Sequence, residues 1–137
     1  MLENHNLILL VDDDESVNYL NKRMLLNFDS EITLVALFNG AEAIRKIITL
    51  NESFCENDSV LVLLDLNMPI LDGWGFLDEF KKIQYALKYT VNIFILSSSF
   101  NPLDIEKAKQ NSLVIDYICK PLTIDKLNSI EEFCKRN

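Results

Sequence analysis

Five short apolar runs recur along the chain, and a longer segment with apolar residues at helical spacing follows each of them. Most runs are rich in Val, Ile and Leu without a clean alternation of apolar and polar positions, which is typical of parallel strands covered on both faces. The runs are Leu7–Val11, Ile32–Leu37, Val60–Leu64, Val91–Leu96 and Val114–Ile118. Strand alternating with helix predicts an α/β domain with right-handed crossovers and a parallel sheet.

The segments that follow the runs carry further signs of helix. In three of them, apolar residues fall on one helical face: Val17, Leu20, Met24 and Phe28; Ala41, Ile44, Ile47 and Ile48; and Ile124, Leu127, Ile130 and Cys134. Residues that cap helix N-termini precede four segments: Asp14, Asn39 with Glu42 three residues later, Asn101 before Pro102, and Thr123. Side-chain oxygens at such positions accept hydrogen bonds from the free N–H groups of a first helical turn. Both signals predict helices that pack on the sheet.

The composition fits one folded domain. The chain has 137 residues, 49% of them apolar, with only three Gly and three Pro, which argues against disordered spacers. Since domains cluster near ~100–150 residues, we expect a single domain over residues 1–137 and no fused effector.

Net charge and cysteine content limit the partners and the cellular compartment that we expect for the protein. The net charge of −8 repels phosphate backbones and anionic lipid, so no direct nucleic-acid or membrane partner is expected. No apolar stretch approaches the ~20 residues that cross a bilayer, and the N-terminus lacks a basic targeting region. The three cysteines, Cys55, Cys119 and Cys134, show no CxxC spacing. Free thiols in a reducing cytoplasm therefore fit better than a disulfide framework or a zinc site.

Polar residues gather where four of the five predicted strands end. They are Asp12, Asp13, Asp14 and Glu15 after the first run, Asp65 and Asn67 after the third, Ser97, Ser98 and Ser99 after the fourth, and Tyr117 with Lys120-Pro121 at the fifth. In an open parallel sheet, ligands bind outside the carboxyl ends of the strands. A single polar strand end is common in proteins. The convergence of four such ends on one edge of the sheet indicates a binding site there.

These residue types suit phosphoryl transfer to an aspartate. Clustered carboxylates with a nearby carbonyl form a hard-oxygen site for Mg²⁺. A lysine and a serine hydroxyl neutralise and hydrogen-bond the oxygens of a phosphoryl group, and an aspartate beside the metal can carry it as an acyl phosphate. The sequence has no Walker A, GxGxxG or HExxH motif. Its one histidine, His5, is interpreted as a terminal-tail residue, so we expect a protein that receives a phosphoryl group rather than passing one from its own histidine.

Four motifs at these spacings resemble those of bacterial response-regulator receiver domains, the CheY-like family. The matching segments are Ile8–Glu15, Leu63–Pro69 with Asp72-Gly73, Ile95–Ser98 and Tyr117–Pro121. The resemblance runs from Leu7 to about Cys134, and it implies a receiver core over about residues 7–134 with no output domain. It implies a doubly wound, five-stranded parallel sheet in the order 2-1-3-4-5, flanked by five helices in the flavodoxin-like arrangement.

The resemblance also implies a role for each residue of the proposed metal and phosphoryl site. Asp65 would be the phosphoacceptor, and Asp12 and Asp13 the acidic pair, with Asp13 as a direct Mg²⁺ ligand and Asp12 acting partly through water. Asp65 and the backbone carbonyl of Asn67 would complete the metal site. Lys120 would pair with the phosphoryl oxygens. The domain would catalyse its own phosphorylation and dephosphorylation and would not be a conventional turnover enzyme.

Two further positions are implied to act as a switch. Ser97 would occupy the hydroxyl position and move toward the phosphoryl group, while Tyr117 would turn inward on phosphorylation. The Lys120-Pro121 bond would be cis. The phosphoryl group would come from a sensor histidine kinase or a histidine phosphotransfer protein in the cytoplasm, and the signal would pass to a protein target by direct contact.

Some positions depart from the family pattern or have ordinary interpretations. Asp14 is assigned as a helix cap, because two aspartates suffice for the acidic pair. Asp72-Gly73 is interpreted as a turn, and Trp74 and Phe76 as packing residues. Ser98 stands where a small residue such as Ala is common, and it preserves size with a hydroxyl that can hydrogen-bond locally. Leu122 replaces a common Phe, which is a change of packing.

Two other functions compete with the phosphoacceptor switch. One is a receiver-shaped interaction module that works without phosphorylation, and the intact Asp65, acidic pair, Ser97 and Lys120 argue against it. The other is a small aspartyl-phosphate hydrolase. Such enzymes typically place a second Asp two residues after the nucleophile, where this chain has Asn67, so this function ranks low.

Overall fold

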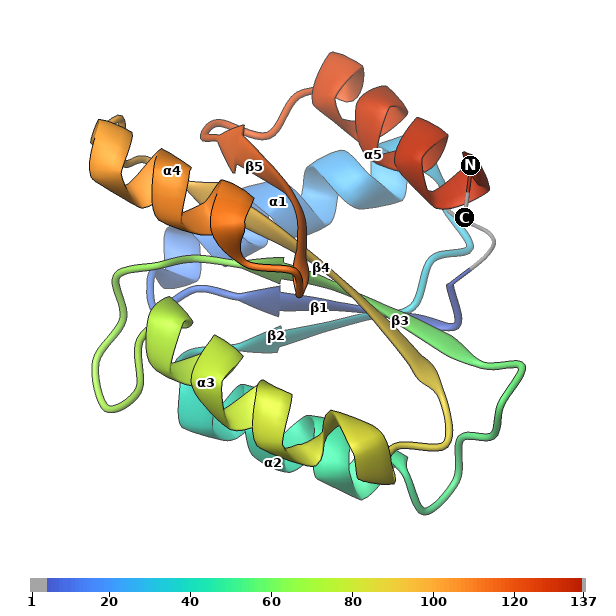
Figure 1. Cartoon of the computed structure of the whole chain (residues 1–137). Helices are drawn as coiled ribbons and strands as arrows, with labels where there is room; N and C mark the ends of the chain where they lie inside the picture. The colour runs from blue at the N-terminus through green and yellow to red at the C-terminus, as the bar shows by residue number, and fades with distance from the viewer. Residues whose placement is uncertain (1–4, 137) are drawn as a thin grey trace.

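Within residues 5–136, which the computed structural model describes, five strands alternate with five helices (Figure 1). Residues 1–4, part of the segment predicted to lack a targeting signal, and residue 137 lie outside the described range. The strands are β1 (Leu7–Val11), β2 (Leu34–Leu37), β3 (Ser59–Leu64), β4 (Thr90–Ser97) and β5 (Val114–Cys119). The helices are α1 (Glu15–Phe28), α2 (Gly40–Leu50), α3 (Gly73–Ile83), α4 (Pro102–Gln110) and α5 (Ile124–Arg136), with a 3-10 turn η1 (Gln84–Ala86) after α3.

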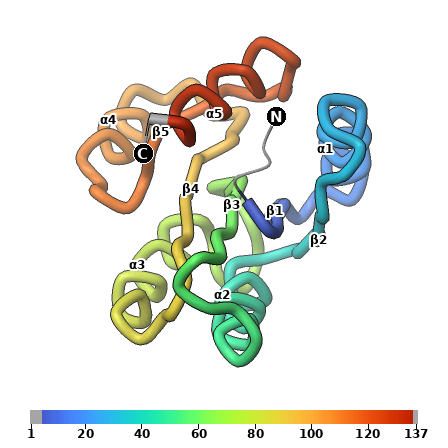
Figure 2. Tube along the Cα trace, turned by 90° about the vertical axis from the view of Figure 1, so that its right-hand side faces the viewer, coloured from blue at the N-terminus to red at the C-terminus, as the bar shows by residue number. Residues whose placement is uncertain are grey.

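The sheet has the predicted topology. Its strands pair in parallel in the order β2-β1-β3-β4-β5. Helices α1 and α5 cover one face of the sheet, and α2, α3 and α4 cover the other (Figure 2). The strand order reverses between β1 and β3, and a crevice at such a switch point is where open α/β sheets bind ligands.

The core lies on both faces of the sheet, because successive side chains of a strand point to opposite sides. In β1, Leu7, Leu9 and Val11 pack toward α2 and α3, whereas Ile8 and Leu10 pack toward α1 and α5. The same alternation continues through β3 and β4. A strand buried on both sides has no polar face, which is why these segments read as uninterrupted apolar runs.

The edge strand β2 differs from its prediction at one end. The apolar run begins at Ile32, but pairing with β1 begins at Leu34. The Ile32 N–H instead donates to the carbonyl of Asp29 in the turn after α1, and its side chain packs against the core beside α1 and α5. The apolar pattern thus reports the burial of Ile32 and not its strand pairing.

The predicted apolar face of α1 is partly wrong. Leu20 is 63% exposed, whereas the buried positions of the helix are Asn18, Asn21 and Leu25. The two asparagines lie on the inward face, and the Asn18 Nδ2 donates to the Asp12 carbonyl. A buried amide that finds a hydrogen-bond partner escapes the cost of desolvation, so polar residues can occupy this face.

The predicted apolar faces of α2 and α5 are also partly wrong. Ile48 and Ile124 are exposed, contrary to the predicted faces, while Ile47, Leu127 and Ile130 are buried as predicted. Both exposed isoleucines lie next to the buried stripe of their helix. Helical spacing alone does not distinguish the buried centre of such a stripe from its exposed margin. The four predicted caps are confirmed, since Asp14, Asn39, Asn101 and Thr123 each accept a hydrogen bond from an N–H of the first turn that follows.

His5 is not a free tail residue. Its Nε2 lies 3.0 Å from the Asn92 Oδ1 in β4, and burial lowers the pKa of the imidazole, against a smaller opposing effect of this hydrogen bond. It lies before β1, at the end of the sheet opposite to the carboxyl edge, so it takes no part in the site described below. Cys55, Cys119 and Cys134 are free thiols, as predicted. Within the described residues, no helix has both the length and the apolar composition that a bilayer crossing needs.

Two leucines of α1 test the corrected face. Leu25→Ala removes a fully buried side chain and is expected to lower the free energy of unfolding by about 2–5 kcal/mol. Leu20→Ala, on the same helix but 63% exposed, is expected to change it by less than about 0.5 kcal/mol. Urea unfolding measures both variants, and equal losses would show that the face is assigned wrongly.

Candidate functional site

The parallel register of β1 and β3 places two aspartates side by side at the carboxyl edge. Val11 is paired with Leu64, so Asp12 and Asp65 follow at the same level, and the Asp65 N–H donates to the Val11 carbonyl at 2.9 Å. Both aspartates are nearly buried, with 4% and 6% of their surface exposed. The strand pairing thus holds the backbones of the two aspartates next to each other.

Asp13 completes an acidic cluster with these two residues. One carboxylate oxygen from each of Asp12, Asp13 and Asp65 lies within 4.8 Å of the others, as the sequence predicted. Asp13 is exposed, so the cluster opens to solvent on that side. Carboxylate oxygens this close, with access to water, fit a small hard cation such as Mg²⁺. Asn67 lies exposed two residues after Asp65, and the role of its carbonyl as a ligand stays a prediction.

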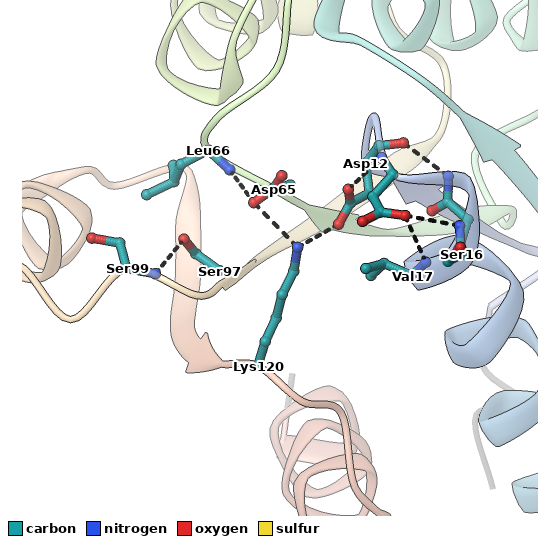
Figure 3. Close-up of polar contacts among 10 residues, drawn as sticks. Asp12, Ser16, Val17, Asp65, Leu66, Ser97, Ser99 and Lys120 are labelled. Carbon is teal, nitrogen blue, oxygen red and sulfur yellow. Dashed lines mark hydrogen bonds and ion pairs between the residues drawn. The ribbon is translucent and has the colours of Figure 1, made fainter.

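Lys120 reaches this cluster from the end of β5. Its Nζ lies 2.5 Å from the Asp12 Oδ2 and 3.5 Å from the Asp65 Oδ1 (Figure 3). The backbone N–H of Lys120 donates to the Ser97 carbonyl, which ties the lysine to the end of β4. The peptide bond to Pro121 is cis, as the sequence resemblance implied.

The charges of the cluster act on one another. Burial raises the pKa of the Asp65 carboxyl, and the neighbouring charge of Asp12 raises it further, against the opposing effect of Lys120. Burial by itself would lower the pKa of Lys120, but the hydrogen bond and charge of Asp12 and the charge of Asp65 outweigh it, so that pKa is raised. Lys120 therefore stays charged, while Asp65 is ionised at an energetic cost.

The loop between β1 and α1 is held by Asp12 and Asp14. The Asp12 Oδ1 accepts from the Asp14 N–H at 2.9 Å, and the Asp14 Oδ1 caps α1 by accepting from the N–H groups of Ser16 and Val17. Asn18 adds a hydrogen bond to the Asp12 carbonyl at 2.8 Å. The assignment of Asp14 as a cap is confirmed. Asn18 was not identified from the sequence, although an amide within an apolar helical stripe is the signal that points to it.

Ser97 and Tyr117 both contact Ser99, which the sequence placed among the polar residues after the fourth apolar run. Ser97 is buried, and its Oγ accepts from the Ser99 N–H at 3.1 Å. The Tyr117 hydroxyl donates to the Ser99 carbonyl at 2.7 Å. The Ser99 hydroxyl in turn bonds the Asp104 carboxylate in α4 at 2.7 Å. Ser99 thus connects the two predicted switch residues to the first turn of α4, while their movement on phosphorylation stays a prediction.

Asp72-Gly73 is more than the predicted turn. Asp72 caps α3 through a 2.8 Å hydrogen bond from the Gly75 N–H. Gly73 packs against the backbone that follows β3, where a Cβ would lie 2.5 Å from the Asp65 carbonyl oxygen and 2.9 Å from the Leu66 Cα. The absence of a side chain at this position therefore lets α3 approach the Asp65 segment closely.

The segment between Asp65 and Gly73 also stores backbone strain. Ile70 has φ 68°, and the N–H of Leu71 donates to the Pro69 carbonyl two residues earlier. A β-branched residue rarely adopts this conformation, and strained backbone of this kind clusters at functional sites. The carbonyl of Leu71 accepts from the Gly40 N–H, which anchors the segment to α2.

The close approach at Gly73 gives a direct test. Gly73→Ala forces the backbone of Asp65 and Leu66 to shift, and we expect it to lower the free energy of unfolding by about 1–3 kcal/mol. Gly75→Ala is the matched control in the same helical turn, because its Cβ meets the movable side chain of Leu71. Urea unfolding should show the smaller loss for Gly75→Ala, and a neutral Gly73→Ala would contradict the packing described.

Known proteins share this sequence pattern. The family model of the response regulator receiver domain matches residues 8–131. The probable C4-dicarboxylate response regulator DctR of Bacillus subtilis is 29% identical over 129 residues, which are 94% of this chain and 52% of that protein. The transcriptional regulatory protein PrrA of Mycobacterium tuberculosis is 30% identical over 120 residues, 88% of this chain and 46% of that protein. The chain thus spans about half the length of these curated relatives.

Solved structures agree with the family match. A two-component response regulator from Cytophaga hutchinsonii is 31% identical and has a TM-score of 0.80, with 96% of this chain and 97% of that one covered. A response regulator receiver protein from Dyadobacter fermentans has a TM-score of 0.78 over 93% of this chain and 97% of that one, and at 22% identity it shows the shared fold. The fold, the motifs and the family match together establish that this chain belongs to the response regulator receiver domains.

Proposed function

We propose that Asp65 accepts a phosphoryl group with Mg²⁺ bound beside it, and that the phosphorylated domain signals by protein–protein contact. Membership of the receiver family supports a phosphoacceptor signalling role in a two-component system. The observation that carries the finer proposal is the carboxylate cluster of Asp12, Asp13 and Asp65 within 4.8 Å, with the Lys120 ammonium 2.5 Å from Asp12 and 3.5 Å from Asp65.

Phosphoryl transfer at this site needs one bond formed and one broken. A carboxylate oxygen of Asp65 attacks the phosphorus atom, and the bond from phosphorus to the donor breaks, so that the donor leaves with the electron pair. The product is an acyl phosphate on Asp65. Lys120 would donate a hydrogen bond to a phosphoryl oxygen, and its distance of 3.5 Å from Asp65 supports this role.

The acidic residues supply the metal ligands in this proposal. Asp13 and Asp65 would bind Mg²⁺ directly, Asp12 partly through water, and Asn67 through its backbone carbonyl. The exposure of Asp13 leaves room for the water molecules that Mg²⁺ retains. When bound, Mg²⁺ supplies positive charge that neutralises the phosphoryl oxygens. The chain's own part is to hold the carboxylates close together, which the pairing of β1 with β3 does.

Ser97 and Tyr117 are the residues that we propose as the switch. A phosphoryl group on Asp65 offers the Ser97 hydroxyl a charged acceptor, and charge-assisted hydrogen bonds are stronger than neutral ones. Movement of Ser97 toward Asp65 would alter its bond with the Ser99 N–H, and Ser99 also binds the Tyr117 hydroxyl and Asp104. The surface around α4, β5 and α5 would respond.

The donor and the cellular setting are proposed at the level of protein class. Receiver domains accept phosphoryl groups from histidine kinases or histidine phosphotransfer proteins, and we propose such a donor for Asp65. We further propose that residues 1–137 act as a single receiver domain, with a core from about 7 to 134, in the cytoplasm. The net charge of −8 argues against direct DNA contact by residues 1–137.

Phosphorylation of Asp65 can be measured directly. Incubation with acetyl phosphate and Mg²⁺ is expected to add the mass of one phosphoryl group to the intact protein, because Asp65 is the single phosphoacceptor in this proposal. Removal of Mg²⁺ with a chelator should lower the labelled fraction by at least about tenfold. Intact-mass spectrometry measures that fraction.

Two variants make the assay specific. Asp65→Asn should take up no label, whereas Asp125→Asn, an exposed aspartate in the first turn of α5, should be labelled as fully as the wild type. Equal labelling of Asp65→Asn would assign the phosphoryl group to another residue. An unlabelled wild type, under conditions that label other receivers, would favour the interaction module that works without phosphorylation.

A further inference from the structure

A second lysine holds the backbone on both sides of Lys120. The Nζ of Lys126, in the first turn of α5, donates to the Cys119 carbonyl at 2.5 Å and to the Pro121 carbonyl at 2.9 Å. These carbonyls belong to the residues directly before and after Lys120. The Lys126 side chain therefore bridges the chain around the residue that enters the acidic cluster.

The place of Lys126 on the helix is unfavourable for a cation. The N-terminus of a helix carries partial positive charge, so acidic residues are favoured in the first turn and basic ones are not. Thr123 caps the helix by accepting from the Lys126 N–H, and the lysine ammonium, which only donates, cannot serve as an N-terminal cap. Ordering a long side chain also costs conformational entropy. The two carbonyl contacts offset these costs, so the side chain has a specific task there.

That task concerns the placement of Lys120. The Lys120 N–H is bound to the Ser97 carbonyl at 2.9 Å, and Lys126 holds the carbonyls on either side. Three hydrogen bonds thus fix the backbone from which the Lys120 side chain extends to Asp12 and Asp65. A flexible lysine stem transmits any backbone shift to its ammonium, and errors of about 1 Å at a reacting centre can cost about a hundredfold in rate.

We propose that Lys126 is a positioning residue, which holds the backbone carbonyls of Cys119 and Pro121 so that the Lys120 ammonium stays between Asp12 and Asp65. This inference rests on the proposed function of Lys120 in phosphoryl transfer. Packing of α5 is a separate matter, because buried apolar residues on the inward face of the helix seat it on the core. Removing the Lys126 charge should therefore disturb Lys120 and leave the helix in place.

A double-mutant cycle on the full chain tests the proposal. The rate of Asp65 labelling by acetyl phosphate with saturating Mg²⁺ is measured for Lys126→Met, Lys120→Met and the double variant. Lys126→Met should label about tenfold more slowly, and Lys120→Met about a hundredfold more slowly. The double variant should be no slower than Lys120→Met within about twofold, because Lys126 acts through Lys120. Additive losses, or a wild-type rate for Lys126→Met, would overturn the proposal.

Three further variants separate positioning from general stability. Lys126→Arg can still donate to both carbonyls and should restore the rate to within about threefold of the wild type. Lys126→Gln, which keeps one short donor, should fall between Arg and Met, and it replaces Met if that variant fails to fold. Lys135→Met is the control on the same helix and should label normally. A rate unrelated to the donors at position 126 would contradict a positioning role.

Amide hydrogen exchange gives a readout that needs no phosphorylation. The Lys120 N–H should exchange about tenfold faster in Lys126→Met than in the wild type, and unchanged in Lys135→Met. Unaltered exchange at Lys120 would overturn the inference even where labelling of Asp65 succeeds. Failed labelling of the wild type, with faster exchange in Lys126→Met, would overturn the proposed function and keep the structural role of Lys126.

Discussion

The Lys120 ammonium lies between two nearly buried carboxylates, 2.5 Å from Asp12 and 3.5 Å from Asp65, while Asp13 adds a third carboxylate within 4.8 Å. One positive charge facing three negative ones leaves the cluster short of cationic charge. Buried like charges cannot be screened as they are in water, which is why the pKa of Asp65 is raised by burial and by Asp12. The proposed affinity for Mg²⁺ follows from this shortage, and the proposed phosphoryl transfer needs the added positive charge because the phosphoryl group is itself anionic.

The fold makes the crowding unavoidable. The register that pairs Val11 with Leu64 carries the next residue of each strand to the same level, and both strands are buried on two faces. Lys120 is anchored to the end of β4 through its N–H and to α5 through Lys126. The backbone therefore holds Asp12 and Asp65 together, and a bound cation would relieve their repulsion at neutral pH. Catalysis by preorganised charge works in this way.

Much of this could be predicted from the sequence, for reasons that particular residues show. A strand that is buried on both faces has an unbroken run of apolar residues, so the sequence predicts the strands. Acidic residues at strand ends converge in a parallel sheet of this topology, so the sequence also predicts that Asp12 and Asp65 lie together. The prediction that Leu20 is buried is wrong, because the apolar pattern does not show that Asn18 takes the inward position. Asn18 can be buried there because its amide donates a hydrogen bond to the Asp12 carbonyl. Contacts of Ser99, Gly73 and Lys126 depend on loop geometry and close approach, which leave no periodic trace.

The cost of crowding can be measured by thermal unfolding of the wild type and Asp65→Asn, with and without Mg²⁺. Because the folded-state pKa of Asp65 is raised, ionisation of this carboxyl destabilises the fold at neutral pH. Metal-free Asp65→Asn should therefore melt at a higher temperature than the wild type. The difference should shrink as the pH falls through the raised pKa toward 3.8. Mg²⁺ should raise the melting temperature of the wild type more than that of the variant. A metal-free variant that melts lower at neutral pH, or equal stabilisation of both proteins by Mg²⁺, would contradict the account.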